Sequence, residues 1–270
     1  NCSIASITFA AGAASVAYTC ANVGPNAVTL EVTDASGNLS TCNATVTVAD
    51  TVTPVISCNN ITVQLSGAGS VNVIPGDVLT PVSTDACGIA TETINTAAVA
   101  TYNCSNVGAN TATILVTDNN GNSSTCNVTI TVEDNVNPTM LCQPFTASIG
   151  AGGTVTVNPS DVDNGSNDAC GALTLTLNGQ ASLSFDCTDV GPNNVTLIGT
   201  DVNGNVDSCI AVVTVQDIIP PTAICQNLTA QLDAAGNATV TAAQIDNGSN
   251  DNCAITTIDF GGGISSIAYT

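Results

Sequence analysis

The cysteines of this chain recur at a fixed interval, and this periodicity constrains the fold more than any other feature. One series consists of Cys58, Cys142 and Cys225, whose numbers differ by 84 and then by 83. Self-similarity at a fixed period is the signature of tandem structural repeats. Three further series recur at nearly the same interval: Cys2, Cys87, Cys170 and Cys253; Cys20, Cys104 and Cys187; and Cys42, Cys126 and Cys209.

The residues around the cysteines repeat as well. The segment VTDASGNLSTCNATVTVAD begins at Val32, and the similar segment VTDNNGNSSTCNVTITVED begins at Val116. Each period is therefore one structural module. We expect the C-terminal part of a repeat, two complete repeats and the N-terminal part of another, with these boundaries: 1–49, 50–133, 134–216 and 217–270.

The local pattern within a repeat predicts a small β-sandwich. Thr, Val and Ile segments at 61–65, 70–74, 98–102, 111–117 and 125–132 alternate with clusters of Gly, Asn, Asp and Pro, and no segment shows a helical period. β-Branched residues between turn-forming clusters indicate strands. About seven short strands in such a repeat are typical of an immunoglobulin-like sandwich. We therefore predict an all-β chain of tandem immunoglobulin-like repeats of about 83 residues, stapled by disulfides.

The charge composition excludes several functions. The chain has no Lys, Arg or His and 21 acidic residues, a formal net charge of −21. Nucleic acids and anionic membranes are bound through Lys and Arg, so neither is an expected partner. No apolar run reaches the roughly 18 residues of a membrane span, so we expect no membrane insertion in this segment. Catalysis needs tunable acid–base groups or an activated nucleophile. We therefore predict a protein that is not an enzyme and requires no cofactor.

Four cysteines per repeat without histidine or a CxxC motif favour disulfides and an oxidising compartment. Repeats that stack head to tail send the chain out at the pole opposite the one where it enters, which brings Cys58 to Cys126. Cys87 and Cys104 bracket a segment that we expect to form a hairpin with adjacent ends. Four cysteines allow three connectivities, and this reasoning selects one of them. The predicted pairs are Cys58–Cys126, Cys87–Cys104, Cys142–Cys209, Cys170–Cys187 and Cys2–Cys20, which leaves Cys42, Cys225 and Cys253 without partners in this chain.

Acidic residues also occupy repeat-equivalent positions. Asp50 and Asp134 lie at repeat junctions, while Asp118 and Asp201 open the turn before the last strand. The topology predicts that Asp50 approaches Asp118 and that Asp134 approaches Asp201. Clustered oxygen ligands suit Ca²⁺, but Asp, Asn and Gly also form turns without any metal, so both interpretations stay open. The candidate calcium ligands are Asp50, Asp118, Asp134, Asp201, Asp161, Asp163 and Asp168.

The frame of the repeat resembles a known module. The segments DNVNPTMLCQ, NDAC and NDNC, together with VTDxxGNxSTC followed by TVTV and an acid, resemble the hyalin repeat, an immunoglobulin-like extracellular adhesion domain. Cys104 and Cys187 depart from the hyalin pattern, in which an apolar residue precedes the VG turn. Long four-cysteine arrays with almost no basic residues are similar to giant secreted surface adhesins of Bacteroidetes, including the gliding-motility adhesin. This resemblance implies an extracellular location on a bacterial cell surface.

We therefore expect a structural stalk or filament segment that projects a distal adhesive region from the cell, with gliding motility as one setting. The expected partners are the neighbouring repeats of the same chain and a cell-surface anchoring protein. The alternative is that the repeats themselves bind a surface glycan or a partner protein. Glycan sites usually present aromatic platforms, and the sequence contains only three Tyr and four Phe, which favours the spacer.

Overall fold

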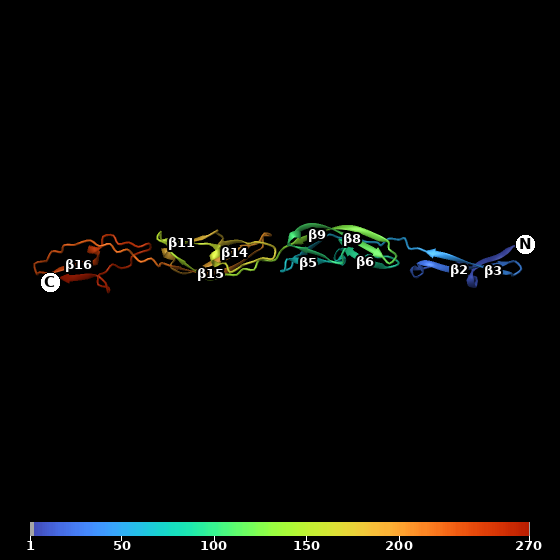
Figure 1. Cartoon of the computed structure of the whole chain (residues 1–270), viewed down its shortest axis with the longest axis horizontal. Coiled ribbons are helices and arrows are strands. Elements are labelled where there is room, and N and C mark those ends of the chain that lie inside the picture. The colour runs from blue at the N-terminus through green and yellow to red at the C-terminus, as the bar shows by residue number, and fades with distance from the viewer. Residues whose placement is uncertain (1–2, 270) are drawn as a thin grey trace. The chain divides into compact units, whose positions relative to one another are not determined.

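The computed structural model describes residues 3–269 and shows an almost entirely β chain (Figure 1). The chain divides into two compact units. One unit is Asn1–Asp134 and the other is Asn135–Thr270. The division falls within one residue of the predicted boundary between the two central repeats. No helix in the described part of the chain is long and apolar enough to cross a membrane.

The repeat 50–133 has two sheets. A four-stranded sheet has the order β4-β9-β8-β6, with β4 parallel to β9 and the other pairs antiparallel, and a two-stranded sheet joins β5 to β7. Ile114 and Ile130 in the larger sheet and Val73 in the smaller one are fully buried. The elements are β4 (Ile61–Gln64), β5 (Ser70–Val73), α1 (Pro75–Val78), β6 (Ile89–Ile94), β7 (Ala100–Asn103), η3 (Cys104–Asn106), β8 (Gly108–Asp118) and β9 (Ser123–Glu133).

The repeat 134–216 has the same arrangement, with the sheets β10-β15-β14-β12 and β11-β13. A single apolar cluster joins the two sheets, since it includes Val157 and Phe185 from the smaller sheet and Leu197 and Val213 from the larger one. This is the core of a sandwich, as predicted. The elements are β10 (Phe145–Ser148), β11 (Thr154–Val157), α2 (Pro159–Val162), β12 (Thr174–Leu177), β13 (Leu183–Asp186), η4 (Cys187–Asp189), β14 (Gly191–Thr200) and β15 (Val206–Gln216).

The remaining parts of the chain hold pieces of the same sandwich. Residues 3–49 form a three-stranded antiparallel sheet, and residues 217–269 form a two-stranded one. The elements of the first are β1 (Ile4–Phe9), η1 (Ala10–Gly12), η2 (Cys20–Asn22), β2 (Gly24–Asp34) and β3 (Leu39–Val48), and those of the second are β16 (Ala238–Thr241), α3 (Ala242–Ile245) and β17 (Ser266–Tyr269).

The segment between Cys87 and Cys104 departs from its prediction. It contains two strands, β6 and β7, but these belong to different sheets, because β6 pairs with β8 and β7 pairs with β5. The chain therefore crosses from one layer of the sandwich to the other between them. The two ends of the segment do not lie side by side in one hairpin, and this removes the reason for pairing the two cysteines.

Candidate functional site

Each complete repeat is closed by a disulfide between its beginning and its last strand. Cys58 is joined to Cys126 and Cys142 is joined to Cys209, which are the predicted pairs. Cys126 lies on β9. Cys58 lies in the segment that precedes β4 and forms an isolated β-bridge with Leu79. Each bond encloses most of its repeat, with sequence separations of 68 and 67 residues.

Two further disulfides join consecutive repeats within a unit. Cys20 is bonded to Cys87, and Cys187 is bonded to Cys253, with sequence separations of 67 and 66 residues. Cys20 and Cys187 are the first residues of the short helices η2 and η4, and η4 follows directly after β13. The partner in each case belongs to the next repeat. The junction between repeats is therefore crossed twice, once by the backbone and once by a disulfide.

These bonds correct three predicted pairs. Cys20 is not available to Cys2, Cys87 is not available to Cys104, and Cys187 is not available to Cys170. The physical reason is the layer change between β6 and β7, which carries the ends of the predicted hairpin to different partners.

The other cysteines complete the inventory. Cys253, expected to have no partner, is bonded to Cys187. Cys104 and Cys170 are also disulfide-bonded. Cys2 lies outside the described residues. Among the described cysteines, Cys42 and Cys225 are exposed free thiols.

The turn before the last strand is built around a buried aspartate. Asp118 is 2% exposed, and its Oδ1 accepts hydrogen bonds from the backbone N–H groups of Asn120 and Asn122, each at 2.8 Å. Its Oδ2 accepts a third bond from Asn122 Nδ2, also at 2.8 Å. Burial raises the pKa of the Asp118 carboxyl, but the bonds from this turn outweigh burial and hold the pKa below its usual value.

Asp201 lies in the same turn of the next repeat. Its carboxylate accepts from the backbone of Asn203 and Asn205 and from Asn205 Nδ2, each at 2.8 Å. Burial raises the pKa of the Asp201 carboxyl, but the hydrogen bonds lower it by more, so the pKa lies below its usual value. The motif DxxGN, in which Gly121 and Gly204 have φ values of 92° and 95°, encodes this turn.

Asp50 lies at the junction between repeats 1–49 and 50–133. Its backbone carbonyl accepts a hydrogen bond from Asn122 Nδ2 at 3.2 Å, so Asn122 links the junction to the turn of Asp118. Asp50, Asp85 and Cys87 form a group in which one potential ligand atom of each lies within 4.8 Å of the others. Since Cys87 is held in a disulfide, the ionisable members of this group are the two carboxylates.

The two carboxylates each use one oxygen locally. Asp50 Oδ1 accepts from Val52 N at 3.1 Å, and Asp85 Oδ1 accepts from Cys87 N at 2.7 Å. The second oxygen, Oδ2, is buried without a hydrogen-bond partner in both residues. Sequence reasoning singled out Asp50 as a ligand candidate but joined it to Asp118 rather than to Asp85.

The equivalent junction of the second unit contains an additional amide. Asp217 Oδ1 accepts hydrogen bonds from Ile219 N and from Asn252 Nδ2, both at 3.1 Å. Asn252 occupies the position that Ala86 has in the first junction. A Cβ on Gly153 would lie 3.0 Å from the Asn252 carbonyl, so the absence of a side chain there permits this close approach. In the sequence this difference is the change from DAC at residues 85–87 to DNC at residues 251–253. Only the fold shows that the Asn side chain of the second segment reaches the junction aspartate.

The other predicted ligands are held in local turns. Asp161 Oδ2 accepts from Asn158 N at 2.7 Å at the start of α2, and Asp163 Oδ1 accepts from Ser166 N at 3.0 Å. Asp168 Oδ2 accepts from Cys170 N at 2.6 Å. Asp134 is buried, with 6% of its surface exposed. It belongs to the first unit, whereas Asp201 belongs to the second, so the predicted approach of Asp134 to Asp201 stays a prediction.

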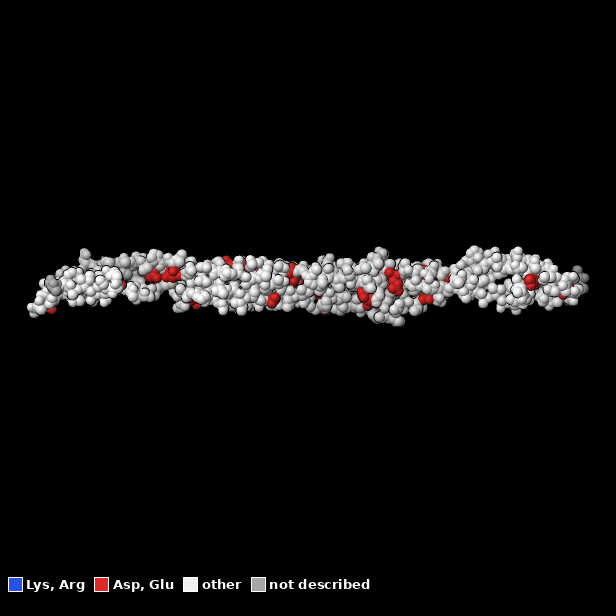
Figure 2. All heavy atoms as spheres, turned by 90° about the horizontal axis from the view of Figure 1, so that it is seen from below, with Lys and Arg blue, Asp and Glu red and all other residues white. Residues whose placement is uncertain are grey.

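The surface carries charge of one sign only. Figure 2 shows acidic side chains as small, separate patches on an otherwise uncharged face, without Lys or Arg. A surface of this kind lacks the basic groups that bind phosphate-rich partners.

The sandwich repeats, the disulfides and the covalently closed junctions are together typical of an extracellular repeat protein. No protein-family model matches the chain. Hyalin from Strongylocentrotus purpuratus is 32% identical over 217 residues, which are 75% of this chain and 17% of hyalin. This similarity supports the assignment of the repeats as hyalin-repeat, immunoglobulin-like modules.

Solved structures of other proteins are also similar. Cadherin domains 1–4 of protocadherin gamma B7 match 87% of this chain and 68% of theirs, with 11% identity and a TM-score of 0.34. Immunoglobulin domains 1–5 of Sidekick-1 match 78% of this chain and 52% of theirs, with 10% identity and a TM-score of 0.31. An endo-fucoidan hydrolase of glycoside hydrolase family 107 matches 80% of this chain and 39% of its own, with 17% identity and a TM-score of 0.26.

Proposed function

We propose that this chain is a spacer segment of a repetitive extracellular adhesin, which projects a distal adhesive region from the surface to which the protein is anchored. The observation that carries this proposal is the second covalent connection across repeat junctions, Cys20–Cys87 and Cys187–Cys253. We further propose that the anchor is a protein of a bacterial cell surface and that the array takes part in gliding motility. Support for these two points comes only from the resemblance of the repeats to those of giant bacterial surface adhesins.

The inter-repeat bonds would limit how far the chain extends under tension. Between Cys20 and Cys87 the backbone runs for 67 residues, and the disulfide holds their Cα atoms 5.2 Å apart. A fully extended segment of this length would span roughly 220 Å, because an extended chain advances by about 3.3 Å per residue. Either this bond or the Cys58–Cys126 bond is enough to withhold about this length when the sandwich unfolds, which suits a protein that transmits load.

Single-molecule pulling on the 270-residue chain tests this role. The Cys58–Cys126 bond bridges part of the same stretch, so the comparison uses a Cys58→Ala/Cys126→Ala background, in which a closed Cys20–Cys87 bond should keep the 67-residue segment hidden at all forces that unfold the sandwich. When Cys20→Ala/Cys87→Ala is added to this background, it should release roughly 220 Å of additional length. Equal extension of the two proteins would contradict a load-bearing bond. Specific binding of the chain to an immobilised glycan or protein, with no such difference in extension, would favour the alternative that the repeats are themselves the binding sites.

We also propose that the junction acids bind Ca²⁺, with Asp50 and Asp85 as ligands. The support is the pair of buried Oδ2 atoms that have no hydrogen-bond partner, in a group whose ligand atoms lie within 4.8 Å. Oxygen donors of this kind suit Ca²⁺. Millimolar Ca²⁺ should raise the melting temperature of the chain relative to chelator, and Asp85→Asn should reduce that increase. An unchanged melting temperature would leave these acids as turn formers.

A further inference from the structure

The larger sheet of the repeat 134–216 has an outer face that carries no charge. Side chains alternate between the two faces of a strand, and Ala211, Val213 and Val215 of β15 are buried on the core side. The residues between them therefore point away from the core. Asp207 is the only charged residue in the four strands of this sheet, and it alternates to the core side. The outer face consists of hydroxyl, amide and aliphatic side chains.

Four aliphatic side chains form a strip on this face. Val206, Ile210 and Val212 of β15 are 49%, 68% and 39% exposed. Ile198 of β14 lies opposite Ser208, which places it diagonally to Val206 and Ile210 and within reach of both. Single exposed apolar side chains are common on any protein surface, whereas a contiguous group marks an interaction site.

The equivalent strip of the repeat 50–133 is polar. Asn127 and Thr129 of β9 occupy the places that Ile210 and Val212 have on β15. Thr favours a strand as Val and Ile do, so strand formation does not require the apolar residues. The apolar strip is thus a property of one repeat and not of the fold, which indicates a separate role.

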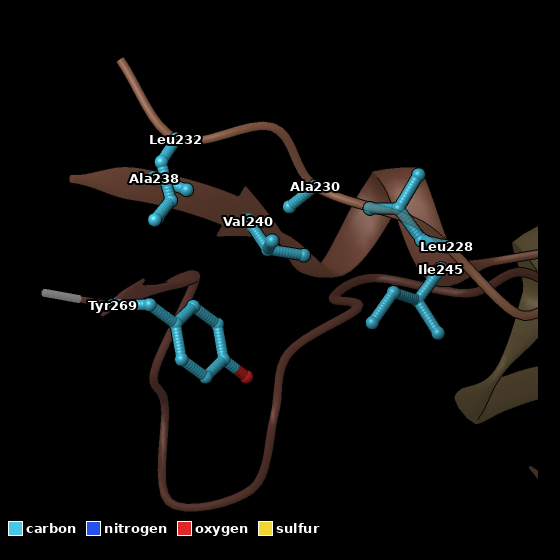
Figure 3. A pocket seen from close by; sticks show the side chains of 7 residues that line it. All are labelled: Leu228, Ala230, Leu232, Ala238, Val240, Ile245 and Tyr269. Atoms are coloured by element: carbon cyan, nitrogen blue, oxygen red, sulfur yellow. The ribbon is translucent and has the colours of Figure 1, made fainter. Parts of the chain in front are cut away.

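Apolar side chains at core positions are a different case. Figure 3 shows Val240 and Tyr269 beside a pocket in residues 217–269. Val157 and Phe185 have the equivalent positions in the repeat 134–216 and belong to its core cluster. The strip on β14 and β15 has no such role, because the core of its own repeat lies on the opposite side of the sheet.

We propose that this outer face binds the same face of a second copy of the chain, in a two-fold symmetric contact. Two chains of net charge −21 repel each other, and a face without acids is where they approach with the least repulsion. Contact between two such faces covers aliphatic groups and buries no unpaired charge. A basic partner would instead be drawn to the acidic turns and junctions. The inference goes beyond the spacer role and does not rest on it.

The size of the face sets the strength of the contact. β14 pairs with β15 over its 10 residues, and β10 and β12 add four residues each. At about 3.3 Å per residue and about 4.8 Å between strands, the face covers roughly 450 Å². Two faces together bury roughly 900 Å², whereas stable interfaces bury about 1,200 Å² or more. The contact is therefore weak and reversible, with an expected dissociation constant on the order of 0.1 to 1 mM.

Sedimentation equilibrium of the chain at concentrations up to about 1 mM tests the contact. Free thiols are alkylated without reduction, so that no disulfide forms between copies. The parent chain should show a monomer–dimer equilibrium. Ile210→Asn/Val212→Thr gives the strip the residues of the other repeat, which keeps the fold, and should weaken association at least tenfold. A parent chain that stays monomeric, or a variant that associates as the parent does, would overturn the proposal.

A matched pair of charge variants separates this contact from general repulsion. Ile210→Asp and Asn127→Asp each add one negative charge, at equivalent positions of the two complete repeats. Ile210→Asp should abolish dimer formation, because it places an unpaired charge within the contact. Asn127→Asp should associate as the parent chain does, and circular dichroism checks the fold of both. Equal loss of association in the two variants would trace the effect to net charge and would overturn the proposed face.

Discussion

Removal of the Cys58–Cys126 bond should destabilise one repeat strongly and leave its equivalent in the other unit unchanged. The bond spans a sequence separation of 68 residues. In the chain-entropy model, closure of a loop of this length contributes roughly 4 kcal/mol to stability. This is a large share of the about 5 to 15 kcal/mol that stabilise a typical domain. The repeat 50–133 in a Cys58→Ala/Cys126→Ala chain should therefore unfold much more often than in the parent chain.

Hydrogen exchange with mass spectrometry resolves the effect by segment, which the three Tyr of a chain without Trp cannot do by fluorescence. A loss of roughly 4 kcal/mol corresponds to an increase in exchange rate on the order of 1,000-fold for amides of β8 and β9 that exchange by opening of the whole repeat. Amides of β14 and β15 should keep their protection. The matched control, Cys142→Ala/Cys209→Ala, should reverse this pattern. An increase below tenfold, or equal deprotection of both hairpins by one variant, would refute the reasoning.

Three further predictions concern the core, the turn and the junction. Ile114→Ala should lower the free energy of unfolding of its repeat by about 2 to 5 kcal/mol, measured by chemical denaturation, because Ile114 is fully buried on the central strand. The depressed pKa of Asp118 means that its stabilising contribution is present above the unfolded pKa of about 3.9 and is lost as pH falls through the folded value. Asp118→Asn should therefore be less stable at neutral pH and show a smaller loss of stability in acid; an unchanged acid titration of stability would contradict this. Ala86→Asn should raise the free energy of unfolding by supplying the junction with the amide that Asn252 supplies to Asp217, and Asn252→Ala should lower it, by about 1 to 3 kcal/mol in each case. Chemical denaturation measures both changes, and an unchanged stability of the Asn252→Ala chain would contradict this role of the amide.

The repeat and the strands were accessible from sequence because both depend on local pattern. Cysteine periodicity and Thr/Val/Ile segments between turn clusters indicated the sandwich, and the central strands β8 and β9 contain the predicted segments 111–117 and 125–132. The pair Cys58–Cys126 followed from the direction in which the chain must cross the repeat. These arguments need no knowledge of which strand joins which sheet.

The junction could not be predicted in the same way because it depends on the pairing of strands. Nothing local to the segment 88–103 shows that its two strands enter different layers, and this layer change redirects Cys87 to Cys20. The predicted approach of Asp50 to the turn of Asp118 is made through Asn122 Nδ2, which donates to both residues, whereas the proximity of Asp85 to Asp50 was not predicted. The side chains at a junction contact residues of two repeats, so their partners cannot be predicted from the pattern of a single repeat.

Disulfide mapping of the native chain tests the covalent junction most directly. Trypsin cannot cut a chain without Lys or Arg, so digestion with pepsin in acid is suitable, and acid also suppresses disulfide exchange. The account predicts peptides in which Cys20 is linked to Cys87 and Cys187 to Cys253. Peptides that link Cys87 to Cys104 and Cys170 to Cys187 would contradict it, because each repeat would then be closed on itself and the junctions would be held by the backbone alone.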